Sequence, residues 1–243
     1  MKLSFYCTRW GQEPMPWDRF LKRVQEEGYD GVEMVLPATA AGQEPILNGL
    51  QEYGLKLIAQ HGDTVATDFS AHAKELESRL RSMLEAKAVL ITSCTGKDYF
   101  SFEQNTQLIL ISKRIAQENN QPIIHETRRG KFSFAAHITR KYLEAIPSLR
   151  LNLDIAHWYM VADSYLDDQA AAVELAIERT AHIQARVGNI QGFEPGSPQW
   201  DQAWQQHLLQ WDKVVVRHRR LGVAELGITC DRYMKDFLKE RYK

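Results

Sequence analysis

The chain has 243 residues, of which 44% are hydrophobic and 25% charged, with a formal net charge of −1. These values are typical of a globular domain, and the near balance of charge excludes the strong positive field with which proteins hold a nucleic-acid backbone. No apolar stretch reaches the ~18 residues of a membrane span, and the amino terminus lacks a signal-peptide core. The three cysteines lie far apart, which argues against a disulfide framework. We therefore expect a cytoplasmic protein with no nucleic-acid or membrane partner.

Short apolar runs alternate with amphipathic helical patterns along the whole chain. The expected strands are 2–7, 31–36, 55–60, 88–93, 122–126, 149–154, 180–186 and 223–228. Helical periodicity fills the gaps, and its first example is the stripe of Trp17, Phe20, Leu21 and Val24 on one helix face. The alternation is typical of βα units that build a parallel sheet.

Eight such units predict a single (β/α)8 TIM barrel that spans residues 1–243 as one domain. The length agrees, because this barrel typically needs ~250 residues. A doubly wound open sheet is the alternative fold. It normally has fewer strands and often carries a glycine-rich phosphate loop, and the chain has neither a G-x-G-x-x-G nor a Walker motif.

Four oxygen-bearing side chains each lie at or just past the end of an apolar run, about one strand–helix unit of roughly 30 residues apart. They are Glu126, Asp154, Gln184 and Glu225. In a parallel barrel the carboxyl ends of the strands meet at one mouth, where active sites lie. Three acids brought together there repel one another unless a cation lies between them. The pattern therefore predicts a divalent metal site.

Carboxylate and amide oxygens suit Mg²⁺ or Mn²⁺, and a nearby imidazole from His157 or His182 would extend the choice to Co²⁺ or Zn²⁺. Such an ion would polarise a carbonyl and a neighbouring hydroxyl, which acidifies the C–H bond between them. A metal-bound or flanking glutamate can then move the proton.

Six segments, in order along the chain, resemble the xylose-isomerase-like TIM-barrel superfamily of sugar isomerases and epimerases, which includes hydroxypyruvate isomerase and tagatose 3-epimerase relatives. They are Gly31-Val-Glu33, His125-Glu-Thr-Arg-Arg-Gly130, Asp154-Ile-Ala-His157-Trp158, His182-Ile-Gln184-Ala-Arg-Val-Gly188, Glu194-Pro-Gly-Ser-Pro198 and Glu225-Leu-Gly227. The resemblance implies a divalent-metal-dependent isomerase or epimerase of a small sugar or keto-sugar that acts through a metal-stabilised enediolate.

The resemblance also implies the roles of individual residues. One metal ion would be held by Glu126, Asp154, Gln184 and Glu225. Glu126 and Glu225 would stand on opposite faces of the substrate and exchange protons with it. The residues expected to bind substrate or line its pocket are His61, His157 and Arg186. The resemblance further implies a homo-oligomer.

Two positions depart from the pattern of these relatives. Most relatives with the Ala-Arg-Val-Gly segment carry histidine where this chain has Gln184, although hydroxypyruvate-isomerase-like members carry glutamine there. Relatives also often carry histidine where this chain has Arg128, a fixed cation. Arg128 therefore indicates either an anionic substrate, which it would bind, or altered activity.

Three other functions remain open from the sequence. A lyase of the inosose-dehydratase type would use the same site, and a barrel that has lost its chemistry would bind a metabolite without turnover. Endonuclease-IV-like cleavage is disfavoured, because that chemistry uses a histidine-rich zinc cluster and this near-neutral chain has 8 histidines.

The roles of two residues also remain open from the sequence. Arg186 either binds substrate or only neutralises the carboxylates, and Glu33 either lines the pocket, orients a ligand or is structural.

Overall fold

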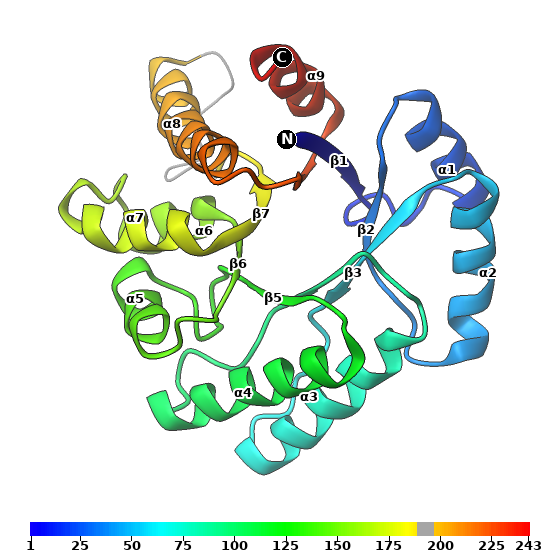
Figure 1. The fold of residues 1–243 in the computed structure, drawn as a ribbon, viewed down its shortest axis with the longest axis horizontal. Helices are drawn as coiled ribbons and strands as arrows, with labels where there is room; N and C mark the ends of the chain where they lie inside the picture. The colour runs from blue at the N-terminus through cyan, green and yellow to red at the C-terminus, as the bar shows by residue number, and fades with distance from the viewer. Residues whose placement is uncertain (189–196) are drawn as a thin grey trace.

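The computed structural model describes residues 1–188 and 197–243, and its eight parallel strands close into one barrel in the order β1 to β8. Figure 1 shows the strands at the centre with the helices arranged round them. The predicted (β/α)8 barrel is therefore confirmed, and the open sheet is wrong. The strands are β1 Lys2–Thr8, β2 Gly31–Val35, β3 Lys56–His61, β4 Leu90–Ser93, β5 Ile123–Glu126, β6 Leu151–Leu153, β7 Thr180–Ala185 and β8 Glu225–Cys230.

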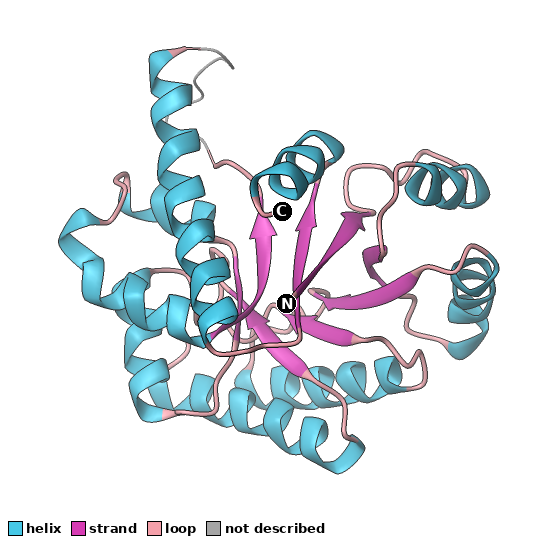
Figure 2. Ribbon diagram, turned by 45° about the horizontal axis from the view of Figure 1, so that its top comes forward, coloured by secondary structure: helices cyan, strands magenta, loops and turns pink. Residues whose placement is uncertain are grey.

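The helices form an outer layer that covers the strands, as Figure 2 shows. They are α1 Trp17–Glu26, α2 Ala40–Glu52, α3 Phe69–Leu84, α4 Phe102–Asn119, α5 Ala136–Ala145, α6 Ile155–Ala162, the 3₁₀ turn η1 Asp167–Gln169, α7 Ala170–Arg179, α8 Pro198–Arg220 and α9 Arg232–Arg241. Within the described residues, none of these helices combines the length and the apolar character that a membrane span requires.

The main apolar core lies between the strands and the helices. Strand side chains alternate between the two faces of the barrel wall, and the outward set is apolar and packs under the helices. Examples are Val32, Leu57, Ile91, Leu151 and Ile183, all of which are buried. Burial of such a side chain contributes roughly 1.5–3 kcal/mol. This outer core holds the barrel closed and leaves the inward positions free for polar side chains.

Inward side chains fill the barrel in layers, because staggered strands bring residues of alternate strands to the same height. The pairing register gives a lower layer of Tyr6, Ile58, Ile124 and His182, and a middle layer of Glu33, Thr92, Asn152 and Thr229. Above them lie Gln60, Glu126 and Gln184. The middle and upper layers are thus polar, and they lie beneath the mouth where active sites of this fold are found.

Two strand glycines make room for the large side chains of the lower layer. The Tyr6 and His182 rings lie 5.9 Å apart between their centroids. A Cβ atom on Gly227 would lie 2.4 Å from His182 Nδ1, and one on Gly31 would lie 2.2 Å from the Lys56 carbonyl oxygen and 2.9 Å from the Tyr6 ring. Neither glycine has a positive φ, so both are needed for space and not for backbone conformation.

The last strand corrects the prediction for Glu225. The expected strand 223–228 begins two residues too early, because β8 begins at Glu225 and continues through Thr229 and Cys230. Glu225 therefore lies at the amino end of the barrel, where it pairs in register with Lys2, accepts a hydrogen bond from the Ser4 hydroxyl and forms an ion pair with Lys56 at 3.1 Å. The expectation that Glu225 converges with Glu126 at the mouth is wrong.

We predict that Gly227→Ala destabilises the barrel, because its Cβ would collide with the buried His182 ring. The free energy of unfolding measured in urea should fall by about 1–3 kcal/mol, the usual cost of overpacking. Gly62→Ala is the matched control, since the nearest atom to its Cβ would be Cys94 Sγ at 3.8 Å; its effect should stay within about 0.5 kcal/mol. Equal effects of the two substitutions would contradict this explanation of the glycine.

Candidate metal and active site

Three potential metal ligands meet at the carboxyl end of the barrel. Glu126 is the last residue of β5, Asp154 directly follows β6, and His157 lies one turn into α6. One ligand atom from each residue lies within 4.8 Å of the others. All three are predicted site residues. The structure brings them together because β5 and β6 are neighbours in the barrel.

Glu126 is buried and held by three side-chain donors. Gln60 Nε2 donates to its Oε2 at 3.1 Å, and the Cys94 thiol donates to the same oxygen at 3.7 Å. Arg128 Nη1 donates to Oε1 at 3.2 Å. Burial raises the pKa of the Cys94 thiol, so this group stays protonated and acts as a donor. No local pattern singles out Gln60; its place on β3, two strands from Glu126, becomes apparent only once the register is known.

Asp154 is buried and has one oxygen free. Its Oδ2 forms an ion pair with Arg186 Nε at 2.5 Å, whereas Oδ1 has no hydrogen-bond partner among the described residues. Burial raises the pKa of Asp154 to about 6; the positive charge of Arg186 opposes this shift and the negative charge of Glu126 adds to it. A buried carboxylate oxygen without a partner is costly, and a ligand that approaches it from the mouth would remove that cost.

His157 is a neutral imidazole at the edge of this cluster. Its Nε2 lies 3.7 Å from Asp154 Oδ2, and its buried Nδ1 has no hydrogen-bond partner within residues 1–188 and 197–243. Burial lowers the pKa of His157 to about 3, and the positive charges of Arg186, Arg128 and Arg129 lower it further. A neutral ring can offer a nitrogen lone pair to a metal ion or a substrate hydroxyl.

Gln184 lies in the upper layer, but its amide is bound to Glu33. Gln184 Nε2 donates to Glu33 Oε2 at 2.6 Å, and the Thr92 hydroxyl donates to Glu33 Oε1 at 3.0 Å. Burial raises the pKa of Glu33 to about 7, and the negative charge of Glu126 contributes to the shift. This contact turns the amide nitrogen toward the middle layer, so the amide oxygen is the atom of Gln184 left for the mouth.

His61 does not have the position expected of it. It ends β3 with its ring fully buried, where Nδ1 lies 2.8 Å from Ser93 Oγ and Nε2 lies 2.7 Å from Thr64 Oγ1. Burial lowers the pKa of His61 to about 4. Because both ring nitrogens are bound to protein hydroxyls, the prediction that His61 lines the substrate pocket is wrong. It ties the ends of β3 and β4 together.

The residues at the mouth fit a divalent cation. Two carboxylates and a neutral imidazole are oxygen and nitrogen donors that suit Mn²⁺, Co²⁺ or Zn²⁺. Asp154 Oδ1, which has no hydrogen-bond partner among the described residues, is open to such an ion. Glu225, also a predicted ligand, lies at the amino end of the barrel and not with these residues. The carboxylate that follows β8 is Asp231, whose side chain caps α9 by accepting from the Met234 N–H at 2.8 Å.

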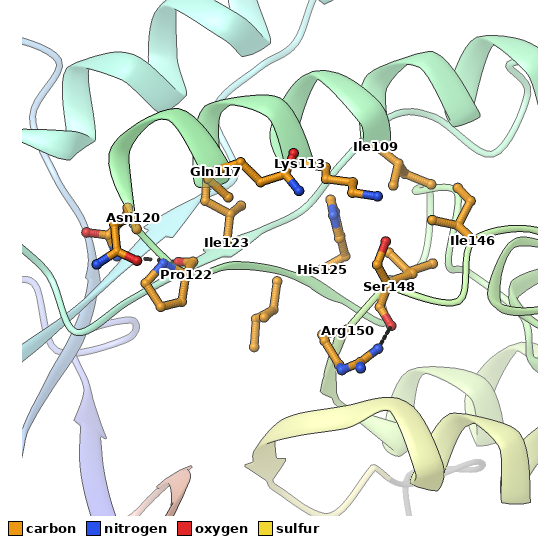
Figure 3. A pocket seen from close by; sticks show the side chains of 14 residues that line it. Ile109, Lys113, Gln117, Asn120, Pro122, Ile123, His125, Ile146, Ser148 and Arg150 are labelled. Atoms are coloured by element: carbon orange, nitrogen blue, oxygen red, sulfur yellow. Dashed lines mark hydrogen bonds between the residues drawn. The ribbon is translucent and has the colours of Figure 1, made fainter.

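A separate cavity of 430 Å³ lies on the outer wall of the barrel, between α4 and the segment that leads into β6. Figure 3 shows His125 among the side chains that line it, with Lys113 and Ile109 from α4. His125 and Glu126 are adjacent on β5 and therefore face opposite sides of the wall. None of the described residues that line this cavity carries a carboxylate, so the cavity is separate from the three potential metal ligands.

The structure is similar to solved structures with this barrel. A probable 3-DHS dehydratase from Bacillus anthracis has 15% identity and a TM-score of 0.61, with 95% of this chain and 93% of that chain covered. The 3-keto-D-glucoside 4-epimerase of E. coli has 14% identity and a TM-score of 0.59, with 95% and 92% covered. Endonuclease IV from Thermus thermophilus has 12% identity and a TM-score of 0.60, with 99% and 100% covered.

No protein-family model and no curated protein matches the chain. At identities of 12–15% the three likenesses establish a shared fold. The chain thus has the xylose-isomerase-like form of the (β/α)8 barrel, as the sequence resemblance implied.

We predict that Glu33 makes the stability of the metal-free protein depend on pH. The folded chain keeps the Glu33 proton up to about pH 7, whereas the unfolded chain loses it near the ordinary value of 4.5. Because the folded state binds more protons in this window, the free energy of unfolding falls as the pH rises. Relative to Glu33→Gln, the wild type should lose roughly 2–4 kcal/mol between pH 4.5 and pH 8 in urea titrations. A difference that does not change with pH would contradict the prediction.

Proposed function

We propose that this chain is a divalent-metal-dependent isomerase of a small sugar or keto-sugar that transfers a proton at the barrel mouth. The observation that supports this most directly is the approach of Glu126, Asp154 and His157 to within 4.8 Å, with Asp154 Oδ1 buried and without a hydrogen-bond partner among the described residues. These residues would hold the ion, and the oxygen of Gln184 would complete its protein ligands. Mn²⁺ and Mg²⁺ suit the oxygens, and His157 extends the choice to Co²⁺ or Zn²⁺.

The bound cation would polarise a substrate carbonyl and its neighbouring hydroxyl, which makes the C–H bond between them acidic. Glu126 then accepts that proton, exchanges it with solvent and protonates the adjacent carbon, while the hydroxyl proton passes to the former carbonyl oxygen. Gln60 and Arg128 orient its two oxygens from opposite sides. Asp154 is assigned to the ion and not to the proton transfer, because Arg186 already bonds its Oδ2 at 2.5 Å and its Oδ1 has no hydrogen-bond partner among the described residues. His157, neutral at all physiological pH values, donates or accepts a hydrogen bond at a substrate hydroxyl when it is not bound to the ion.

The position of Glu225 favours an isomerase over an epimerase. Inversion of a carbon centre needs proton-carrying groups on both faces of the substrate. The residue expected to act opposite Glu126 lies at the amino end of β8 instead. One carboxylate that returns the proton to the same face is sufficient for the exchange of an aldose and a ketose.

A lyase is the second candidate function. Elimination of water begins with the same proton removal, and the similar barrel of the probable 3-DHS dehydratase supports keeping this reaction in view. The two reactions differ in their products, since only elimination releases a water molecule from the substrate.

We predict that Glu126→Gln and Asp154→Asn each weaken Mn²⁺ binding at least about 10-fold in isothermal titration calorimetry, because each removes an anionic oxygen from the mouth. Glu225→Gln is the matched control, and it should change the affinity less than about 2-fold because Glu225 lies at the other end of the barrel. With a ketose panel in D₂O, NMR should show one solvent deuterium in the isomerised product and no loss of water. Loss of Mn²⁺ binding in Glu225→Gln with retention in Glu126→Gln would reject the proposed site.

A further inference from the structure

Two arginines at the mouth hold the metal-binding carboxylates and remain accessible to solvent. The Arg128 side chain is 42% exposed and the Arg186 side chain 44% exposed, although their carboxylate partners Glu126 and Asp154 are almost fully buried. Each guanidinium thus spans from a buried carboxylate to the open mouth. A ligand at the mouth can therefore reach both cations.

Each of the two arginines uses only part of its guanidinium group in contacts with described residues, which leaves N–H donors for a ligand. Arg186 uses Nε on Asp154 Oδ2, and Arg128 uses Nη1 on Glu126 Oε1 and on the Cys94 sulfur. An arginine that served only to neutralise a carboxylate would favour the two-fold, fork-on-fork contact. Here Asp154 Oδ1 has no hydrogen-bond partner among the described residues, although the Arg186 guanidinium bonds Oδ2. Among contacts between described residues, the remaining N–H groups of both arginines have no acceptor.

Positive charge exceeds negative charge at this mouth even before a cation binds. The carboxylates of Glu126 and Asp154, with Glu33 beneath them, have Arg128, Arg186 and Lys131 as cationic neighbours, and the positive charge of Arg129 also acts on His157 in this cluster. A divalent ion would add two more positive charges. The chain as a whole carries a net charge of only −1, so this excess is a property of the site.

We infer that the substrate of the proposed isomerase carries an anionic group, a carboxylate or a phosphate monoester, which Arg128 and Arg186 bind while its carbonyl end lies at Glu126. Guanidinium groups suit both anions, because their planar N–H donors match two oxygens of either one. The inference rests on the proposed function for the identity of the reaction and on the two arginines for the charge of the substrate.

Binding of inorganic phosphate to the metal-free protein tests the anion site without turnover. Calorimetry should show binding to the wild type and about 10- to 100-fold weaker binding to Arg128→Gln, the usual effect of losing one charge-assisted hydrogen bond. Arg140→Gln is the matched control, since Arg140 pairs with Glu144 on the outer surface of α5; its affinity should equal that of the wild type. Undetectable phosphate binding, or equal affinity in all three proteins, would overturn the anion site.

Turnover of three related substrates in the Mn²⁺-loaded enzyme then tests whether the anion site binds the substrate. The kcat/KM value for a ketose phosphate or for a keto acid such as hydroxypyruvate should exceed that for the neutral ketose by about 100-fold, and Arg128→Gln should reduce this ratio about 10-fold or more. Preference for the phosphate or for the keto acid identifies the anion. Equal turnover of the neutral ketose would overturn this inference and leave the isomerase intact, whereas phosphate binding without any turnover would overturn the isomerase.

Discussion

The structure depends most on the cost of placing two carboxylates, Glu126 and Asp154, side by side in the buried mouth of a barrel. Desolvation and the negative charge of Glu126 both oppose the ionisation of Asp154, which is the reason that the pKa of Asp154 rises to about 6 despite its ion pair with Arg186. The chain offsets part of this cost with an arginine on each carboxylate. A divalent cation would offset the rest, and it could bind at Asp154 Oδ1, which has no hydrogen-bond partner among the described residues.

Strand register determines which other groups can serve the mouth. The inward layers are polar from the middle of the barrel upward, so Glu33 can hold the Gln184 amide from below at 2.6 Å. This contact occupies the amide nitrogen and leaves the amide oxygen of Gln184 as its remaining acceptor. The buried carboxyl of Glu33 thus fixes the orientation of the Gln184 amide.

Much of the barrel and half of the site could be predicted from sequence periodicity. Glu126 and Asp154 lie at the ends of their strands as expected, because each ends a short apolar run whose limits are unambiguous. The expectation for Glu225 fails because the apolar Val223 and Ala224 predict strand, whereas Gly222 has a φ of +66° in the turn before them and the strand begins only at Glu225. The role of His61 could not be predicted from the neighbouring sequence, because its contact with Ser93 depends on the pairing of two strands. Ser93 and Thr64 together bind both of its ring nitrogens.

The most direct test is a crystal structure of the protein soaked in Mn²⁺, with an anomalous difference map calculated at a wavelength where manganese scatters anomalously. We expect one strong peak at the carboxyl end of the barrel, within coordination distance of Glu126 and Asp154 oxygens, with Arg186 moved off Asp154 or retained only on Oδ2. A barrel mouth without a peak, or a peak beside Glu225 at the amino end, would contradict a metal site built on these two carboxylates.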